Sequence, residues 1–457
     1  MQRADNRTSA GKADFKTLVV GLGKTGVSCA RYLRAQGVSV AVTDSRANPP
    51  GLAELRRELP EVQVFTGGFQ PPIFAAAAEL VVSPGVPVAE PLIQEALARG
   101  VPVLGDVALF ARAARAPVCA ITGSNGKSTV TTLLDLMAQA SGRRVAVGGN
   151  LGEPVLDLLN DAVELYVVEV SSFQLETTPQ LHAKAAVCLN ISPDHLDRYP
   201  SLDAYVAAKA RVYGDAEVAV INRDDPRVCA MPRKAGREIG FTLGGPASGD
   251  YGLGHRDGVP WLSRGTEPLM PTDQVLIPGR HNLANALAAL ALAEACALDL
   301  EACLEALRRF RGLDHRSQLV TERRGVRWFD DSKGTNPGAT VAALEGLVPP
   351  GAGHRAVLIA GGDGKGADFT PLRRAVDRTA RAVVLIGRDA PRIAEALKGR
   401  AEMRRATDMA EAVALAAELA RPGDCVLLSP ACASFDMFEN YEHRGRAFAE
   451  AVRGLTP

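Results

Sequence analysis

The sequence lacks the features that would assign it to several special classes of protein. Its eight cysteines form no Cys-x-x-Cys pair and are too sparse in 457 residues for a disulfide scaffold. No run of about 18 apolar residues is uninterrupted, so no membrane-spanning helix is expected. Lysine plus arginine and aspartate plus glutamate both number 52, which leaves no basic excess for nucleic acid or anionic lipid. We therefore expect a cytoplasmic protein with reduced thiols, no nucleic-acid partner and no membrane insertion.

What the chain does contain is the composition and order of a large α/β protein. Apolar residues make up 47% and charged residues 23%, and the length corresponds to about three domains at about 150 residues each. A β-branched apolar run, a glycine-rich turn and a helical pattern follow one another in residues 17–37, 116–142 and 355–376. Strands alternating with helices favour parallel sheets covered by helices. The predicted fold is a Rossmann-like N-terminal domain, a central P-loop ATPase-like parallel sheet and a Rossmann-like C-terminal domain.

The predicted domains are residues 1–105, 106–311 and 312–457. The first boundary follows the strand-like run that ends at Gly105, and the second follows an alanine-rich helical stretch that ends near Arg311. Residues 1–14 are polar, lack the apolar core of a signal peptide and are expected to be disordered. Glycine and proline are frequent in residues 244–271, which predicts surface excursions from the middle domain.

A phosphate-binding loop is the most specific motif in the chain. Residues 122–129 read TGSNGKST, follow a buried-looking strand and open a helix. Backbone N–H groups at the helix start would cradle phosphates, Lys127 would reach the terminal phosphates, and Ser128 would bind Mg²⁺. The spacing is G-x-x-G-K-S, shorter than that of the common loop, and a surface lysine on a glycine-rich turn is the alternative. The motif indicates ATP binding.

A second glycine motif leaves its ligand open. Residues 21–26 read GLGKTG, and Asp44 ends the next predicted strand, as in the dinucleotide fingerprint. Taken alone, the motif predicts a nicotinamide oxidoreductase. An ATP loop on the same chain makes a redox cofactor redundant, and the same geometry binds any diphosphate, including that of a UDP-sugar. A tight turn without a ligand is the third possibility.

Several strand ends carry polar side chains typical of a catalytic site. Glu169 ends an apolar strand, where a carboxylate suits Mg²⁺. His195 lies in the loop NISPDHLDR, where a metal or substrate role competes with a structural one. Lys209, in AAKARVY, is interpreted from the residues alone as an exposed helix lysine. The loops DDSKGTNP, GGDGK and SPACASFD in the last third are equally compatible with turns and with anion sites.

Taken in order, these motifs resemble the Mur ligase family. TGSNGKST, ELYVVEVSSFQLE, LNISPDHLDRY, GRHNLANALAA, GLDHRSQ, DDSKGTNP and SPACASFD cover nearly the whole chain after its polar start. The segments GGDGKGADF and SPACASFDMF are most similar to those of the member that adds D-glutamate, and the D-N-P-R motif of the diaminopimelate-adding member is absent. The resemblance implies an ATP-dependent amide-bond ligase of peptidoglycan precursor synthesis. It would join D-glutamate to UDP-N-acetylmuramoyl-L-alanine through an acyl phosphate.

The resemblance also implies roles for individual residues. The catalytic residues would be Lys127, His195, Lys209 and Arg316. ATP would be bound by Gly123, Ser124, Asn125, Gly126, Lys127, Ser128, Thr129, Asn285, Arg316 and Asp331. The UDP-linked substrate would contact Lys24, Thr25, Ser45, Arg46, Ser83, Pro84, Gly85 and Asn150. D-Glutamate would contact His195, Thr335, Lys365, Ser434 and Tyr441, where the family often has Phe at the last position. Two Mg²⁺ ions would be held by Ser128, Glu169, His195 and a carbamylated Lys209. A monomer is expected.

Three other functions remain open at this point. One is folylpolyglutamate synthetase, which has a similar ATP domain. In such an enzyme the GLGKTG motif of an N-terminal UDP-binding domain would be unexplained. A dehydrogenase would use that motif for NAD(P)H. A nucleotide-binding module without catalysis would not need Lys127, Glu169, His195 and Lys209 together. Binding of a UDP-linked substrate, of folate or of NAD(P)H distinguishes these alternatives.

Overall fold

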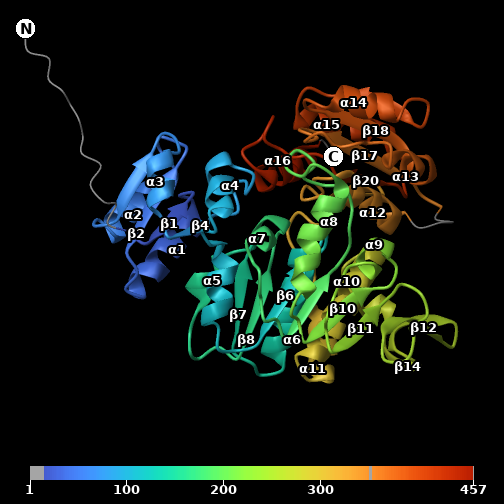
Figure 1. The fold of residues 1–457 in the computed structure, drawn as a ribbon. Helices are drawn as coiled ribbons and strands as arrows, with labels where there is room; N and C mark the ends of the chain where they lie inside the picture. Colours follow the sequence, from blue (N-terminus) through green and yellow to red (C-terminus); the bar gives the residue numbers. More distant parts are fainter. Residues whose placement is uncertain (1–14, 349–352, 456–457) are drawn as a thin grey trace, which may run out of the picture.

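The computed structural model describes residues 15–348 and 353–455, which form three sheets flanked by helices. In Figure 1 the N-terminal part lies to one side in blue, the middle part lies below in cyan to yellow, and the C-terminal part lies above the middle part in orange and red. The three-domain α/β fold class predicted from the sequence is confirmed. The disorder expected for residues 1–14 lies outside the described residues.

The first sheet is entirely parallel, with the order β3-β2-β1-β4-β5. Buried β-branched residues fill its central strands, as expected for a parallel sheet covered on both faces. The strands are β1 (Thr17–Val20), β2 (Val40–Asp44), β3 (Gln63–Thr66), β4 (Glu79–Val82) and β5 (Val103–Leu104). The helices are α1 (Lys24–Ala35), α2 (Leu52–Glu58), α3 (Pro71–Ala76) and α4 (Pro91–Ala98).

The middle sheet has nine strands in the order β14-β13-β12-β11-β10-β9-β6-β8-β7. Its strands are β6 (Val118–Thr122), β7 (Val145–Gly149), β8 (Leu165–Glu169), β9 (Ala185–Cys188), β10 (Val218–Asn222), β11 (Arg237–Phe241), β12 (Tyr251–Arg256), β13 (Val259–Arg264) and β14 (Glu267–Pro271). Its helices are α5 (Asp106–Ala113), α6 (Lys127–Ala140), α7 (Ser172–Glu176), α8 (Leu202–Ala210), α9 (Pro226–Cys229), α10 (Arg280–Ala295) and α11 (Leu300–Arg309), with 3₁₀ turns η1 (Val155–Leu158), η2 (Arg211–Tyr213) and η3 (Thr272–Gln274). Helices α6, α10 and α11 pack together over one face of this sheet.

The third sheet has the order β15-β16-β20-β17-β18-β19 and is parallel except for its edge strand β15. Its strands are β15 (Gln318–Arg323), β16 (Val326–Asp330), β17 (Ala356–Gly361), β18 (Ala380–Ile386), β19 (Glu402–Arg405) and β20 (Cys425–Leu428). Its helices are α12 (Pro337–Leu347), α13 (Leu372–Thr379), α14 (Ala390–Ala396), α15 (Met409–Leu419) and α16 (Tyr441–Gly454). Two apolar clusters, one on each face, bury β17 and β20 completely.

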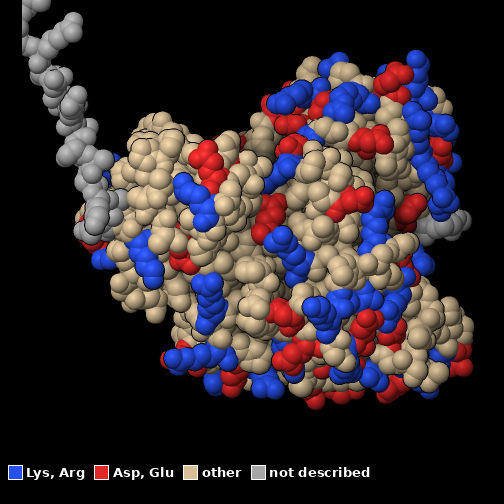
Figure 2. All heavy atoms as spheres, viewed as in Figure 1, with Lys and Arg blue, Asp and Glu red and all other residues tan. Residues whose placement is uncertain are grey.

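The described part of the chain carries surface charges of both signs. Acidic and basic side chains are interspersed over the face shown in Figure 2. No helix in residues 15–348 or 353–455 has the length and apolarity needed to cross a bilayer. All eight cysteines are free thiols, and six of them are buried.

The prediction of surface excursions in residues 244–271 is wrong. Most of this segment forms β12, β13 and β14, which extend the middle sheet as an antiparallel meander. Helix α10 holds the meander through Glu294, which accepts hydrogen bonds from Arg264 at 2.6 and 2.8 Å and from the Tyr251 hydroxyl at 2.8 Å. Arg237 of β11 pairs with the same carboxylate. Turn-forming residues marked the connections between strands, and the strands themselves are stabilised by these long-range contacts.

We predict that Glu294→Gln destabilises the protein in a pH-dependent way. Burial raises the pKa of Glu294, but Arg264, Tyr251 and Arg237 outweigh it and lower the pKa to about 2. The ordinary pKa of Glu is about 4.3, so the stabilisation is fully present above that pH and is lost as the pH falls toward 2. The substitution should cost on the order of 2 kcal/mol at pH 7 and clearly less at pH 3.

Thermal unfolding of both proteins at pH 7, 5 and 3 measures this effect. Glu305→Gln is the matched control, because Glu305 forms only exposed ion pairs with Arg308 and Arg309 on α11. An equal loss of stability at all three pH values would contradict the assignment.

Candidate active site

Three cavities lie where parallel strands end, the edge at which ligands of α/β sheets bind. Loops that follow β1, β2 and β4 line the first cavity. Loops that follow strands of the middle sheet and β16 line the second, and loops that follow β9, β16 and β17 line the third. The second and third are lined from both the middle and the C-terminal domain. A ligand in either would therefore contact two domains at once.

The cavity of the first sheet has a volume of about 570 Å³ and gathers most residues expected to hold the UDP-linked substrate. Asp44 organises it: one oxygen accepts from the backbone N–H of Leu22 at 2.7 Å, and the carboxylate forms an ion pair with Arg46 at 2.7 Å. The predicted residues on its wall are Thr25, Ser45, Arg46, Ser83, Pro84, Gly85 and Asn150. Lys24 is exposed and is not part of this wall.

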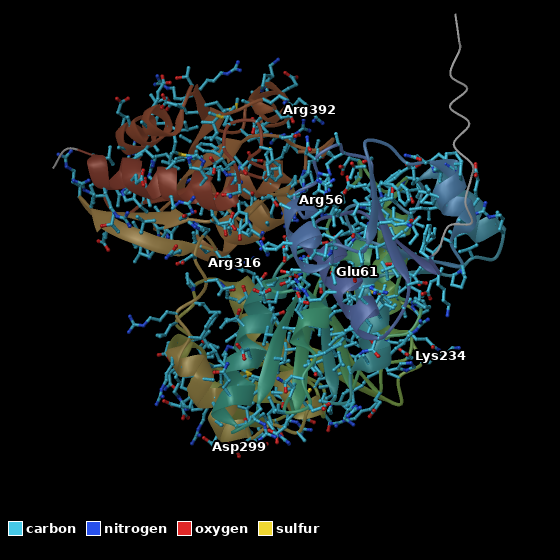
Figure 3. All side chains as sticks on the ribbon, turned by 90° about the vertical axis from the view of Figure 1, so that its left-hand side faces the viewer. Arg56, Glu61, Lys234, Asp299, Arg316 and Arg392 are labelled. Carbon is cyan, nitrogen blue, oxygen red and sulfur yellow. The ribbon has the colours of Figure 1, made fainter. Side chains whose placement is uncertain are left out.

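The cavity between the middle and C-terminal domains measures about 330 Å³. It has an apolar side with Phe241, Leu243 and Ile277, and a polar side with Asn285, Arg316 and Asp331. Arg316 lies between the two domains (Figure 3) and donates to Ser128 Oγ at 2.7 Å. An apolar slot beside buried cations and a helix N-terminus suits a purine nucleotide with a phosphate chain. The predicted residues on this wall are Asn125, Gly126, Thr129, Asn285, Arg316 and Asp331.

The phosphate-binding loop adopts the strand–loop–helix geometry predicted for it. β6 ends at Thr122, and α6 begins at Lys127. Gly126 has a φ of +84°, and a Cβ at this residue would collide with Asn285 Oδ1. Lys127 Nζ donates to the carbonyl oxygens of Gly123 and Ser124 at 2.9 and 3.0 Å. Glycine is required at residue 126 because the backbone is left-handed and Asn285 leaves no room for a side chain.

The interpretation of Lys209 as an exposed helix lysine is wrong. Its side chain is 2% exposed, and Nζ donates to the Gly123 carbonyl at 2.9 Å and lies 4.8 Å from the centre of the Tyr205 ring. Burial, followed by the nearby charge of Lys127, lowers the pKa of Lys209 to about 7. Helix α8 turns this residue under the phosphate-binding loop, a placement that helical periodicity alone did not reveal. A substantial fraction of this buried amine is therefore neutral at pH 7.

Glu169 provides a test of whether a magnesium ion fits this site. Its side chain is 2% exposed. One carboxylate oxygen accepts from Asn150 Nδ2 at 2.6 Å, and the buried Oε2 has no hydrogen-bond partner among the described residues. A buried carboxylate oxygen without a partner is costly unless a cation binds it. No cluster of three His, Cys, Asp or Glu side chains is found in the described chain, so a magnesium ion would take its other ligands from Ser128 and the nucleotide.

The third cavity, of about 220 Å³, contains three of the residues expected to contact D-glutamate: His195, Thr335 and Lys365. Lys365 Nζ lies 3.0 Å from Asp194 Oδ1, and Asn336 Nδ2 donates to Asp194 Oδ2 at 3.2 Å. These two contacts join the C-terminal domain to the loop after β9. Burial lowers the pKa of His195 against the opposing effect of Asp194, which favours the neutral imidazole.

Two other residues expected at D-glutamate lie outside the wall of this cavity. Ser434 is 3% exposed and accepts at its carbonyl from the N–H of Phe438 at 2.8 Å. Tyr441 begins α16, and its ring lies 3.7 Å from Lys333 Nζ. The structure thus separates the predicted D-glutamate residues into a group on the cavity wall and a group on the β20–α16 connection.

Comparison with known proteins agrees with this geometry. Three family models match the chain: "Mur ligase MurD-like, N-terminal domain" over residues 15–105, "Mur ligase middle domain" over 121–293 and "Mur ligase, glutamate ligase domain" over 315–432. The chain belongs to the Mur ligase family. The resemblance stated from the motifs is therefore confirmed.

Curated relatives match almost the full length of this Mur ligase. A UDP-N-acetylmuramoylalanine–D-glutamate ligase of Nitrosococcus oceani is 55% identical over 440 residues, which cover 96% of each chain. One of the same name from Pseudomonas putida is 54% identical over 443 residues, covering 97% of this chain and 98% of the relative.

Solved structures of more distant proteins share the fold. A pseudomurein peptide ligase type C from Methanothermus fervidus has a TM-score of 0.61 at 18% identity and covers 97% of this chain and 100% of its own. UDP-N-acetylmuramate-alanine ligase from Thermotoga maritima has a TM-score of 0.58 at 19% identity, with 96% and 99% covered. At these identities the likeness concerns the fold alone.

The structure brings three further side chains to the site that no motif assigned a role. Lys333 lies on the wall of the nucleotide cavity, and burial, with the charges of Arg316 and Lys127, lowers its pKa to about 8. Asn336 caps α12 and contacts Asn125 across the domain interface at 3.1 Å. Asp194 pairs with Lys365. Their motifs pointed to polar loops, but nothing local to them indicated which loops meet.

We predict that Glu169→Gln weakens magnesium binding without disturbing the fold. Glutamine still accepts the hydrogen bond from Asn150, but it offers a neutral group in place of the negatively charged Oε2 that has no hydrogen-bond donor. With ADP present, Mg²⁺ should raise the melting temperature of the wild type more than that of the variant. A loss of about tenfold in Mg²⁺ affinity corresponds to about 1.4 kcal/mol.

Thermal unfolding with ADP, with and without Mg²⁺, measures the difference. Glu164→Gln serves as the control, because Glu164 pairs with Arg144 at the other end of β8. Equal Mg²⁺-dependent shifts in the wild type and Glu169→Gln would exclude Glu169 as a ligand.

Proposed function

We propose that this Mur ligase uses ATP to join D-glutamate to UDP-N-acetylmuramoyl-L-alanine, forming ADP and phosphate in peptidoglycan precursor synthesis. The main support is that the described site combines a phosphate-binding loop, a second glycine-loop cavity and a cross-domain cavity with a lysine. Relatives at about 55% identity that bear the name of this activity cover almost the entire chain. The enzyme acts as a monomer in the cytoplasm, with domains bounded at residues 105/106 and 311/312.

With its phosphates held by the phosphate-binding loop, ATP would first transfer its γ-phosphoryl group to the substrate carboxylate, and ADP would leave. A carboxylate is a poor acyl donor because oxide is a poor leaving group. In the acyl phosphate the leaving group is phosphate, which departs far more readily. Lys127 and Arg316 neutralise charge on the phosphate chain as it transfers. Mg²⁺, when bound, supplies further charge neutralisation of the phosphate oxygens. Asn285 contacts the adenine, and Asp331 contacts the ribose.

The amine of D-glutamate would then attack the acyl phosphate and expel phosphate through a tetrahedral intermediate. Lys365 binds a carboxylate of the amino acid, as it now binds Asp194 at 3.0 Å. Thr335 lies on the same cavity wall, and Ser434 and Tyr441, which follow β20 in the C-terminal domain, would contact the amino acid from that domain. The hydroxyl of Tyr441 adds a polar group where the family often has Phe. Positioning of the amine against the acyl phosphate contributes most of the rate enhancement.

A carbamate on Lys209 would complete the metal site. The amine is buried, its pKa is about 7, and a neutral amine is the form that adds to CO₂. The carbamate would replace a cation by an oxygen ligand beside Glu169, and with His195 it would support a second Mg²⁺.

We predict a carbamate carbon signal in ¹³C NMR of protein equilibrated with ¹³C-bicarbonate at pH 8. The signal should be absent in Lys209→Arg, whose guanidinium does not form a carbamate. Lys184→Arg is the control, because Lys184 is an exposed lysine paired with Glu217. A signal that persists in Lys209→Arg would place the modification elsewhere, and no signal in the wild type would remove it from the proposal.

Phosphate release tests the overall function. We expect release with ATP, Mg²⁺ and UDP-N-acetylmuramoyl-L-alanine to depend on D-glutamate, with L-glutamate, meso-diaminopimelate and no amine near background. Release with another amine would retain the ligase activity but contradict the roles given to Lys365 and Ser434. No release with any amine would favour a folate-type ligase or a binding protein.

A further inference from the structure

Arg198 joins the UDP-substrate cavity to the middle domain, although no motif assigned it a role. Its side chain is 14% exposed. The guanidinium donates to the carbonyl oxygens of Pro84 at 2.7 Å and Val86 at 3.3 Å, pairs with Glu176 at 3.2 Å, and lies 3.9 Å from the centre of the Phe173 ring. Four contacts hold it in one position. Pro84 and Val86 belong to the cavity wall of the N-terminal domain.

The two carbonyl oxygens belong to a tight turn. The N–H of Val86 donates to the carbonyl of Ser83 at 2.9 Å, so residues 83–86 form a β-turn with Pro84 and Gly85 in its centre. A Pro-Gly centre is typical of a type II turn, in which the glycine has a positive φ. Gly85 is not one of the glycines with positive φ in this structure. The turn has therefore adopted the other orientation of its central peptide.

Arg198 stabilises this orientation because it binds the carbonyl of the central peptide. In a trans peptide the C=O and the N–H point in opposite directions, so fixing the Pro84 carbonyl toward Arg198 fixes the Gly85 N–H away from it. No described residue accepts a hydrogen bond from that N–H, and Gly85 lies on the wall of the 570 Å³ cavity. A flip to type II would replace a donor at the cavity with a carbonyl oxygen.

We propose that Arg198 is a positioning residue for the UDP-linked substrate, holding the Ser83–Val86 turn so that the Gly85 N–H can donate to the substrate. The inference rests on the proposed function and adds that the Arg198 guanidinium orders the part of the 570 Å³ cavity wall formed by residues 83–86. Arg198 itself does not touch the cavity. It acts by fixing the orientation of the Pro84–Gly85 peptide. This peptide can flip because glycine at residue 85 tolerates the positive φ of a type II turn.

The position of Arg198 also connects this wall to the rest of the site. Phe173, beneath the guanidinium, packs edge-on against the His195 ring at 4.8 Å. Asp194, the neighbour of His195, holds Lys365 of the C-terminal domain. One loop, residues 190–199, thus contacts both flanking domains.

Binding measurements on Arg198→Met test the proposal. We expect the Kd for UDP-N-acetylmuramoyl-L-alanine, measured by calorimetry on the full chain, to rise about tenfold, with the Kd for ADP unchanged. Arg211→Met is the matched control: Arg211 donates to two carbonyls of α7, at 3.4 Å to Leu175 and 2.7 Å to Glu176, and neither hydrogen bond reaches the N-terminal domain. The control should bind both ligands as the wild type does.

Gly85→Ala in the Arg198→Met background separates positioning from a purely structural role. Alanine disfavours a positive φ, and a Cβ at residue 85 meets no atom within 4 Å. The second substitution should therefore block the flip and bring the affinity close to that of Gly85→Ala alone, which is the reference because Gly85 lies on the cavity wall. If Arg198→Met does not fold, Arg198→Lys, with and without Gly85→Ala, replaces it in the same comparison.

The results distinguish the inference from the function on which it rests. Unchanged affinity in Arg198→Met, an equal loss for ADP, or no recovery with Gly85→Ala would overturn the positioning role. If the wild type itself does not bind the UDP-linked substrate, the proposed function fails instead. A selective loss that Gly85→Ala restores supports both.

Discussion

Contact between the loop at residues 190–199 and both flanking domains is the constraint on which the rest of the site depends. Asp194 holds Lys365 and Asn336 of the C-terminal domain, and Arg198 holds the turn at residues 83–86 of the N-terminal domain. Between them His195 packs on Phe173 beside the phosphate-binding loop. Because this loop follows a central strand of the middle sheet, its position is set by the most completely buried part of that domain.

Buried cations are concentrated where the middle and C-terminal domains meet. Lys127, Lys209, Arg316 and Lys333 all have pKa values lowered first by burial. Asp331 opposes them, but burial raises its own pKa to about 7, and Glu169 and Asp194 are nearby carboxylates as well. Such a group of charges is costly without anions. The arrangement is therefore suited to bind a polyphosphate and to gain from the charge that the phosphate brings.

Most of the fold and the location of the site could be predicted from residues that act locally. TGSNGKST required a strand, a tight loop and a helix, and β6 and α6 have that form. GLGKTG lies between β1 and α1, and Glu169 ends β8. Glycines that allow tight turns and apolar runs of strand length predict these elements. The local geometry that they favour does not depend on distant contacts.

Other features could not be predicted, because they depend on which loops meet. The burial of Lys209 follows from the packing of α8 under Gly123, the strands at residues 251–271 from pairing and from Glu294, and the role of Arg198 from a contact with residues 83–86 more than 100 positions away. The sequence by itself determined the three α/β units, the phosphate-binding loop and the family. The tertiary structure alone decided which charges are buried and which peptide faces the substrate, since burial and peptide orientation arise from contacts between segments far apart in the sequence, which no local pattern encodes.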